Sequence, residues 1–372
     1  MRVLILTVTA GHGHNQAAAV IMEYLKELDI DCEVLDTYEY INPILSESVA
    51  KGYLISTKFT PAVYGRLYSL AEKREKSDKK LSISSLISAI FSKKLTGFIH
   101  EYDPDVIVCT HIFAAQIISY MQNKGDLRAK TIGIVTDFTI HPFWEDTNLD
   151  CYVVANELLI HQAVKKGISR DKISPIGIPI HTKFSKKIDK KEARKLLGIE
   201  DKTTIFVMSG SMGYGKVETV IQEIDSLDLD LQIISACGNN KSLKKKIDEM
   251  DIRKKIYNFG FVDNVDVIMD ASDCIVTKPG GLTVSESLAK GIPMILINPI
   301  PGQEDRNVEF LLNNGLAIKI SETYPIDEAI YQLMNNNWRR FHLQEMVRRV
   351  GKPNATRDLG KLIIEMGTNK DQ

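Results

Sequence analysis

A segment near the C-terminus combines an apolar strand, a double-glycine turn and a helix start that carries a carboxylate. The strand is expected over residues 274–277, and Gly280 and Gly281 follow it in the turn. Thr283 then opens a helix, and we expect Glu286 in its first turn. Free backbone N–H groups at a helix start bind phosphate, and a carboxylate accepts hydrogen bonds from vicinal hydroxyls. The pattern predicts a site for a phosphate next to a ribose.

The same order of strand, glycine turn and helix occurs at the N-terminus and in the middle of the chain. Residues 3–9 form an apolar strand, Gly11-His12-Gly13-His14 is a turn, and residues 17–28 carry apolar side chains at helical spacing. The strand 204–208 is followed by a turn with three glycines and by a helix over 217–224. We therefore expect two Rossmann-like halves, which start near Met1 and near Thr203.

Apolar runs of strand length alternate with helix-length segments through both halves, which predicts parallel sheets with helices on both faces. The further expected strands are residues 32–35, 106–109, 131–135 and 152–154 in the first half and 232–235, 256–259, 273–277, 294–297 and 317–320 in the second. Two prolines and a glycine interrupt the pattern at residues 175–180. We predict one domain over residues 1–180 and a second over residues 181–372, whose last helix can pack back on the first.

Length and composition limit the number of domains, the kinds of partner and the cellular location that we expect. The chain has 372 residues, with 47 Lys and Arg against 48 Asp and Glu, so two domains and no nucleic-acid partner are expected. Five scattered cysteines, none in a CxxC pair, indicate buried thiols in a reducing cytosol. No run approaches the roughly 18 apolar residues of a membrane span, and residues 3–8 are too short for a secretion signal. We expect a protein that is soluble or peripheral on a membrane.

Residues 51–96 mix basic side chains with apolar and aromatic ones at helical spacing, with ten basic residues against three acidic ones. Such a segment can lie on an anionic membrane surface, at roughly 1 kcal/mol per well-placed cation. A helical hairpin with an apolar core stripe and solvated lysines explains the same composition. The membrane hypothesis names Phe59, Tyr64, Lys73, Arg74, Lys76, Lys79 and Lys80 as contact residues.

Short motifs occur in order along nearly the whole chain: Gly11-His12-Gly13-His14, Val135-Thr136-Asp137, Gly177-Ile178-Pro179-Ile180, Thr277-Lys278-Pro279-Gly280-Gly281 with Glu286, and Pro301-Gly302-Gln303-Glu304 with Asn307. In this order and spacing they resemble the bacterial processive diacylglycerol glucosyltransferases, which are similar to plant monogalactosyldiacylglycerol synthases. The resemblance implies an α/β fold of the GT-B class, in which two Rossmann-like domains with parallel sheets face each other across a cleft. It also implies transfer of a hexose from a UDP-sugar to diacylglycerol with inversion, and no metal or other cofactor.

Candidate residues for the acceptor side lie in the first domain. Inverting transfer needs a base for the acceptor hydroxyl, and His14, at a helix start, has a suitable unperturbed pKa near 6.5. Asp137 follows a buried strand at its carboxyl end, so it is either the alternative base or the partner that orients His14. Helix capping explains each residue as well. In the resemblance His141 and Trp144 line the acceptor side, although a packed aromatic corner is equally consistent.

The resemblance assigns the donor UDP-sugar to the second domain. The diphosphate contacts are Gly210, Ser211 and Gly213, together with Pro279, Gly280, Gly281 and Thr283, and Gly13 from the first domain. Glu286 binds the ribose, Phe261 and Val262 lie against uracil, and Gln303, Glu304 and Asn307 meet the transferred sugar. Lys278 either neutralises phosphate charge or points to solvent, and His181 stands where relatives often have arginine.

Other functions remain open. Three Asp-x-Asp triplets would suit a metal-dependent transferase of another fold, but each precedes a strand, where solvated acids are common. A UDP-N-acetylglucosamine 2-epimerase uses the same fold without an acceptor, another transferase would pair UDP-N-acetylglucosamine with a different lipid, and a regulator would bind a UDP-sugar without chemistry. The identity of the sugar and the number of sugars added are not fixed. We expect a cytoplasmic protein, peripheral on the inner face of the cell membrane.

Overall fold

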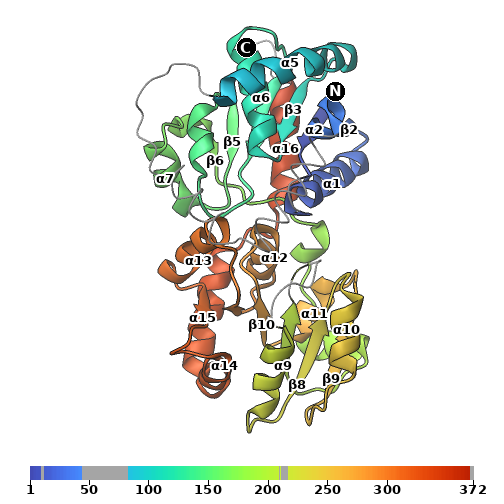
Figure 1. Cartoon of the computed structure of the whole chain (residues 1–372), viewed down its shortest axis with the longest axis vertical. Coiled ribbons are helices and arrows are strands. Elements are labelled where there is room, and N and C mark those ends of the chain that lie inside the picture. The colour runs from blue at the N-terminus through green and yellow to red at the C-terminus, as the bar shows by residue number, and fades with distance from the viewer. Residues whose placement is uncertain (10–11, 44–82, 209, 211–216, 369–372) are drawn as a thin grey trace. The chain divides into compact units, whose positions relative to one another are not determined.

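The computed structural model describes residues 1–9, 12–43, 83–208, 210 and 217–368 (Figure 1). The chain divides into two compact units. Unit 1 comprises Met1–His181, Ile300–Gln303 and Asn354–Gln372, and unit 2 comprises Thr182–Pro299 and Glu304–Pro353. Each unit is built on a sheet of six strands, and every neighbouring pair of strands is parallel. The expected α/β class with two parallel sheets is confirmed.

The sheet of unit 1 has the strand order β2-β1-β3-β4-β5-β6. Its strands are β1 (Arg2–Thr7), β2 (Asp31–Asp36), β3 (Val106–Cys109), β4 (Lys130–Ile134), β5 (Cys151–Val153) and β6 (Ile173–Ser174). Within the described residues, the α-helices of unit 1 are α1 (His12–Glu27), α2 (Thr37–Ile41), α5 (Ile83–Tyr102), α6 (Ile112–Asn123), α7 (Ile160–Lys165) and α16 (Ala355–Thr368). The strand order reverses between β1 and β3, and open α/β sheets bind ligands beyond the carboxyl ends of the strands at such a point.

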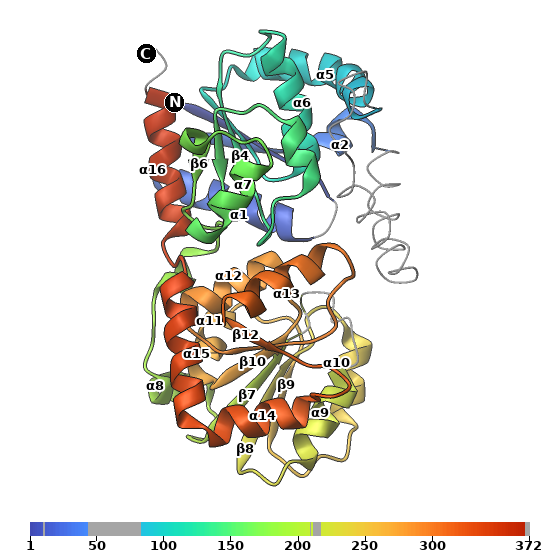
Figure 2. The same ribbon diagram turned by 90° about the vertical axis from the view of Figure 1, so that its left-hand side faces the viewer.

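The core of unit 1 explains why its strands are visible in the sequence. All four side chains of β3 are fully buried, as are Val3 to Leu6 of β1, because helices cover both faces of a parallel sheet. The C-terminal helix α16 belongs to unit 1 (Figure 2). It contributes Leu359 and Ile363 to this core. At Gly360 a Cβ atom would lie 2.5 Å from the ring of Tyr24 in α1, so the absence of a side chain lets the two helices approach.

The sheet of unit 2 has the strand order β12-β11-β10-β7-β8-β9. Its strands are β7 (Thr203–Met208), β8 (Leu231–Ala236), β9 (Ile256–Phe259), β10 (Cys274–Thr277), β11 (Met294–Leu296) and β12 (Ala317–Lys319). Among the described residues, the α-helices of unit 2 are α8 (Lys190–Leu197), α9 (Val217–Ser226), α10 (Lys241–Asp248), α11 (Val265–Ala271), α12 (Gly281–Lys290), α13 (Gln303–Asn313, whose first residue is grouped with unit 1), α14 (Ile326–Asn335) and α15 (Asn337–Val350). Here the order reverses between β7 and β10, which again marks a ligand-binding edge.

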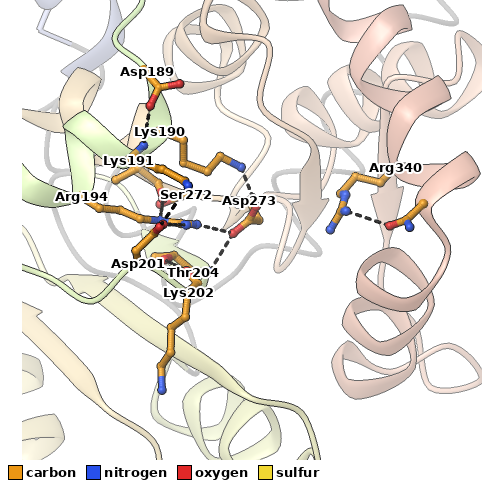
Figure 3. Close-up of polar contacts among 12 residues, drawn as sticks. Asp189, Lys190, Lys191, Arg194, Asp201, Lys202, Thr204, Ser272, Asp273 and Arg340 are labelled. Carbon is orange, nitrogen blue, oxygen red and sulfur yellow. Dashed lines mark hydrogen bonds and ion pairs between the residues drawn. The ribbon is translucent and has the colours of Figure 1, made fainter.

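An ion-pair network around the buried Arg194 and Asp273 fixes the amino ends of β7 and β10 (Figure 3). Arg194 of α8 is 7% exposed and donates from Nη2 to Asp273 Oδ2 and from Nη1 to Asp201 Oδ1, both at 2.8 Å. The backbone N–H of Thr204 donates to the same Asp273 oxygen, also at 2.8 Å. Because Asp273 precedes β10 and Thr204 belongs to β7, the network holds the two strands together at their start.

Two helix starts differ from the sequence expectation. Helix α1 begins at His12, so His12, Gly13 and His14 form its first turn and are not part of the preceding turn. Glycine and histidine have weak helix propensity, which hid these positions from the pattern. Helix α12 begins at Gly281, with Gly280 as N-cap, so Glu286 lies in its second turn and not in its first. The five cysteines are free thiols and four of them are buried, as predicted.

Candidate active site

Three histidines gather at the carboxyl edge of the unit 1 sheet. His14 follows β1 in the first turn of α1, and His111 follows β3 as the N-cap of α6. Their ring centroids are 4.4 Å apart in an edge-to-face arrangement. His141 is the N-cap of the 3₁₀ helix Pro142–Asp146 that follows β4, and it lowers the pKa of His111 through its charge. The neighbouring positions of β1 and β3 bring His14 and His111 together.

The hydrogen bonds of His14 define its tautomer. His14 Nδ1 lies 2.8 Å from the carbonyl oxygen of Thr110 and 3.0 Å from Thr136 Oγ1. A carbonyl oxygen can only accept, so Nδ1 must carry the proton and donate it to Thr110. In a neutral imidazole this leaves Nε2 with an unshared electron pair. The network therefore assigns Nε2 as the basic atom of His14.

The surroundings of His14 keep its imidazole neutral. Burial lowers the pKa of His14 below its usual 6.5, while the negative charge of Asp137 and the hydrogen bond with Thr110 oppose this shift. The hydroxyl of Thr136 lies within hydrogen-bond distance of the same Nδ1 atom. Asp137 acts on the ring through its negative charge. At neutral pH the imidazole of His14 can therefore act as a base through the free electron pair on Nε2. The negative charge of Asp137 increases its basicity.

Sequence reasoning did not single out His111. Its side chain is 6% exposed, and Nδ1 accepts from the N–H of Phe113 at 3.2 Å, so it caps α6. Burial lowers the pKa of His111 well below 6.5, and the charges of His14 and His141 act in the same direction. A positive charge on His14 would therefore disfavour protonation of His111. The signal that could have found it is the one used for Asp137, since His111 also follows a buried strand at its carboxyl end.

The two aromatic-corner residues have different positions. His141 Nδ1 accepts from the N–H of Phe143 at 3.2 Å, and its ring lies 4.8 Å from that of Phe143. Trp144 is 4% exposed and packs edge-to-face on Tyr152, with ring centroids 6.0 Å apart. A Cβ atom on Gly133 of β4 would meet the indole at 2.7 Å. Trp144 is therefore a core residue, which corrects its assignment to the acceptor lining, whereas His141 remains partly exposed at the edge.

Gly13 offers a direct test of whether a ligand approaches the start of α1. A Cβ atom at Gly13 would have no atom within 4 Å, so the fold itself does not require glycine there. We expect Gly13→Ala to leave the melting temperature unchanged or slightly higher and to lower kcat/KM at least tenfold, because a methyl group would displace a substrate from the backbone.

The matched control is Gly97→Ala, since Gly97 in α5 also has open space around its Cβ position. It should leave both stability and kcat/KM close to those of the parent. Full activity of Gly13→Ala would mean that no ligand contacts this turn.

Unit 2 places the predicted phosphate-binding residues at its own reversal point. Gly210 follows β7 with φ of 70°, which glycine adopts without strain. Lys278, Pro279 and Gly280 follow β10, the strand that pairs with β7. Gly280 is the N-cap of α12 and has no side chain to cap it, so the backbone N–H groups of the first turn keep their capacity for an anion.

Glu286 is half-buried in α12 and is perturbed by its surroundings. Burial raises the pKa of Glu286 to about 8, Lys183 lowers it and Asp266 raises it further. At neutral pH the unliganded protein therefore holds Glu286 mostly as the neutral acid. A ligand that donates hydrogen bonds to the carboxylate would favour the ionised form.

In the segment after β11, the position of Asn307 differs from the prediction. Asn307 of α13 is fully buried, and its Nδ2 donates to the carbonyl oxygen of Pro279 at 2.9 Å. It therefore shapes the loop after β10 and has no surface for a sugar. Glu304 lies beside this loop, since its Oε1 would be 3.9 Å from a Cβ on Gly280. Gln303 begins α13, and the structure describes only its backbone.

The other predicted contacts are exposed or fall outside the described residues. Phe261, two residues after β9, is 62% exposed, and Val262 is partly exposed. His181 Nε2 lies 3.4 Å from Glu23 Oε1 of α1. The predicted contacts that lie outside the described residues are Ser211 and Gly213 for the donor and Phe59, Tyr64, Lys73, Arg74, Lys76, Lys79 and Lys80 for the membrane.

Comparisons with known proteins find related families for both halves of the chain and relatives that span nearly all of it. Residues 14–180 match the monogalactosyldiacylglycerol (MGDG) synthase family, and residues 204–359 match the glycosyltransferase family 28 C-terminal domain. The chain is 28% identical to the processive diacylglycerol beta-glucosyltransferase of Bacillus pumilus, over 98% of this chain and 94% of that protein. It is 29% identical to the enzyme of the same name from Bacillus subtilis, over 90% of this chain and 87% of that protein.

Solved structures agree on the architecture. MurG of Acinetobacter baumannii superimposes with a TM-score of 0.65 at 15% identity, over 98% of this chain and 99% of that one. This likeness shows that the chain has the GT-B fold, as the resemblance implied. The two family matches extend from residue 14 to residue 359 with a gap at residues 181–203; the first begins after β1 and covers the other strands of unit 1, and the second covers the sheet of unit 2 from Thr204 onward. Residues 14–180 thus belong with the monogalactosyldiacylglycerol (MGDG) synthase family, and residues 204–359 belong with the glycosyltransferase family 28 C-terminal domain.

Proposed function

We propose that this protein is an inverting glycosyltransferase that moves a hexose, most simply glucose, from a UDP-sugar to diacylglycerol and forms a β-glycosyl-diacylglycerol. The observation that carries this proposal is the similarity over 98% of the chain to a processive diacylglycerol beta-glucosyltransferase. The geometry of unit 1 supports it, since His14 has the neutral imidazole that such a reaction needs.

In the proposed reaction His14 Nε2 takes the proton of the diacylglycerol hydroxyl. The hydroxyl oxygen attacks the anomeric carbon of the sugar from the face opposite the UDP, so the new bond forms as the bond to the phosphate oxygen breaks and the configuration inverts. UDP leaves with the bonding electrons. The hydrogen bond from Nδ1–H to Thr110 stabilises the imidazolium that forms, and the charge of Asp137 does the same.

Unit 2 supplies the proposed donor site. The N–H groups at the start of α12 and the loop at Gly210 hold the diphosphate, and Lys278 neutralises part of its charge. Glu286 binds the ribose hydroxyls, Phe261 and Val262 lie against uracil, and Glu304 with Gln303 contacts the sugar. We propose that no metal ion takes part, which predicts full activity in the presence of a chelator. Asn307 acts through the Pro279 carbonyl and does not touch the sugar.

The decisive experiment is product analysis. The protein is incubated with diacylglycerol vesicles and, in turn, with UDP-glucose, UDP-galactose, UDP-N-acetylglucosamine and UDP-glucuronic acid, and the lipids are identified by mass spectrometry. A hexosyl-diacylglycerol supports the proposal, and longer chains of sugars would reveal processive addition. Conversion of UDP-N-acetylglucosamine without a lipid product would indicate a 2-epimerase, and binding of UDP-sugar without any product would indicate a regulator.

A membrane-bound acceptor raises the question of how the protein reaches it. No helix in the described part of the chain is long and apolar enough to span a bilayer. We propose peripheral association with the inner face of the cell membrane, to which the basic residues of 51–96 contribute. Replacing Lys73, Arg74, Lys76, Lys79 and Lys80 by glutamine should release the protein from phosphatidylglycerol vesicles, because cations act there within a Debye length of about 8 Å.

Sedimentation with vesicles over a series of salt concentrations measures this effect. UDP affinity serves as the control, since the donor unit is unchanged. Equal sedimentation of parent and variant at every salt concentration would show that these lysines form only a solvated face.

A further inference from the structure

One face of α15 exposes large apolar side chains. Trp338 is 67% exposed, Phe341 57% and Met346 40%. They stand at positions i, i+3 and i+8 of the helix, and Arg349 at i+11 continues the same line. We call these four residues the α15 outer face.

The opposite face of α15 is the one that folding requires. Val347 is fully buried, Val350 is 7% exposed, and Leu343 packs against the core of unit 2. Arg340, on the inner side, donates to Asn337 Oδ1 of the same helix at 2.9 Å (Figure 3). The inner face therefore anchors the helix, and the exposed tryptophan and phenylalanine contribute little to that packing. Large apolar side chains that remain together in water generally mark an interaction site.

The charge of α15 indicates the kind of partner. The helix contains four arginines and a single glutamate, Glu345, which pairs with Arg348 at 3.0 Å. Helices that lie on membranes combine basic side chains with tryptophan and phenylalanine, whose rings settle at the level of the lipid headgroups. Contact with a second copy through a two-fold axis would place the arginine-rich ends of identical helices near each other, where they repel.

We propose that the α15 outer face docks on an anionic lipid bilayer, with Trp338 and Phe341 inserted among the headgroups and Arg349 facing lipid phosphates. This surface is separate from residues 51–96 and gives unit 2 a membrane contact of its own. The choice of a bilayer rests on the proposed function, because that reaction takes its acceptor from a membrane.

The two tryptophans of the chain permit a direct measurement. Trp144 is buried and Trp338 is exposed, so the difference between the emission of the parent and of Trp338→Phe reports Trp338. With vesicles of equal parts phosphatidylcholine and phosphatidylglycerol, this difference emission should shift to shorter wavelength and should be quenched by brominated lipid chains. Vesicles of phosphatidylcholine alone should give a much smaller shift. The double variant Trp338→Ser with Phe341→Ser should bind the mixed vesicles at least tenfold more weakly.

The matched control is Leu158→Ser with Leu196→Ser, which removes two other exposed apolar side chains, 51% and 64% exposed, and should bind like the parent. Unchanged emission of Trp338 on the mixed vesicles would overturn the proposal. So would a self-association in solution, seen by analytical ultracentrifugation, that the double serine variant abolishes, because the outer face would then bind a second copy.

Transfer to detergent-dispersed diacylglycerol separates this inference from the proposed function. The double serine variant should transfer sugar to the dispersed lipid at the parental rate and lose activity only on vesicles. If the parent transfers no sugar to either form of the lipid while Trp338 still inserts, the proposed function fails and the docking surface stands. Parental activity of the double serine variant on vesicles, with normal vesicle binding, would overturn the docking surface alone.

Discussion

Replacement of His14 by alanine is expected to lower kcat by about 10²- to 10⁴-fold, the usual contribution of a positioned base. The physical reason is the loss of Nε2, whose electron pair is left free because Nδ1 donates to Thr110. UDP affinity should stay close to the parental value, since the proposed donor residues Glu286 and Gly280 belong to unit 2. Steady-state kinetics on diacylglycerol and calorimetry with UDP measure the two quantities separately.

Asp137→Asn is the companion variant, because it distinguishes the two candidate bases. The charge of Asp137 raises the pKa of His14, so its removal should lower that pKa. A base must be unprotonated, and the acid limb of the kcat/KM profile should therefore move to lower pH while turnover at neutral pH falls only modestly. If His14→Ala retains turnover and Asp137→Asn loses it, Asp137 is the base and His14 is a helix-cap residue.

Glu286→Ala is expected to weaken UDP binding by roughly 1.5 to 3 kcal/mol, because a charged acceptor for the ribose hydroxyls is lost. This corresponds to about a tenfold to 150-fold increase in the dissociation constant. Isothermal calorimetry measures it. Asp266→Asn is the control because it keeps the ribose partner; since the charge of Asp266 raises the pKa of Glu286, this variant should bind UDP at least as tightly as the parent. An unaltered UDP affinity in Glu286→Ala would refute the ribose assignment.

The raised pKa of Glu286 predicts that the affinity for UDP increases with pH. The unliganded protein holds the proton up to a pH of about 8. Ribose hydroxyls that donate to the carboxylate favour its ionised form, so UDP binding below that pH releases a proton. The affinity for UDP should rise about tenfold from pH 7 to pH 9 and then level off. Glu286→Gln should remove this dependence, and a slope that persists in it would assign the titration to another group.

The strands of both sheets could be predicted from sequence because they are buried on both faces. Residues 106–109 and 256–259 coincide with β3 and β9, and most other expected strands differ from the structure by one or two residues at an end. Strand β6 was not predicted, since its two residues are too short to show an apolar run. Glycine turns after strands likewise indicated, before any strand order was known, the edges of the two sheets at which the strand order reverses.

Burial and helix starts were less predictable, since they depend on residues far away in the chain. The resemblance placed Asn307 at the transferred sugar, yet its side chain is fully buried and donates to the Pro279 carbonyl. Trp144 was open to two interpretations, and contact with Tyr152 and Gly133 decides for the core. Both outcomes are set by neighbours that sequence spacing does not reveal.

The sequence by itself determined the chemistry that is available: glycine turns that expose backbone N–H groups, a histidine at a helix start, and carboxylates after strands and in a helix. These are local properties of residue type and spacing. Only the tertiary structure decided which groups meet and in which protonation state. The adjacency of β1 and β3 brings Thr110 to His14 and thereby selects its tautomer, and burial in unit 2 raises the pKa of Glu286. Proximity and desolvation arise from strand order and packing, which no local stretch of sequence contains.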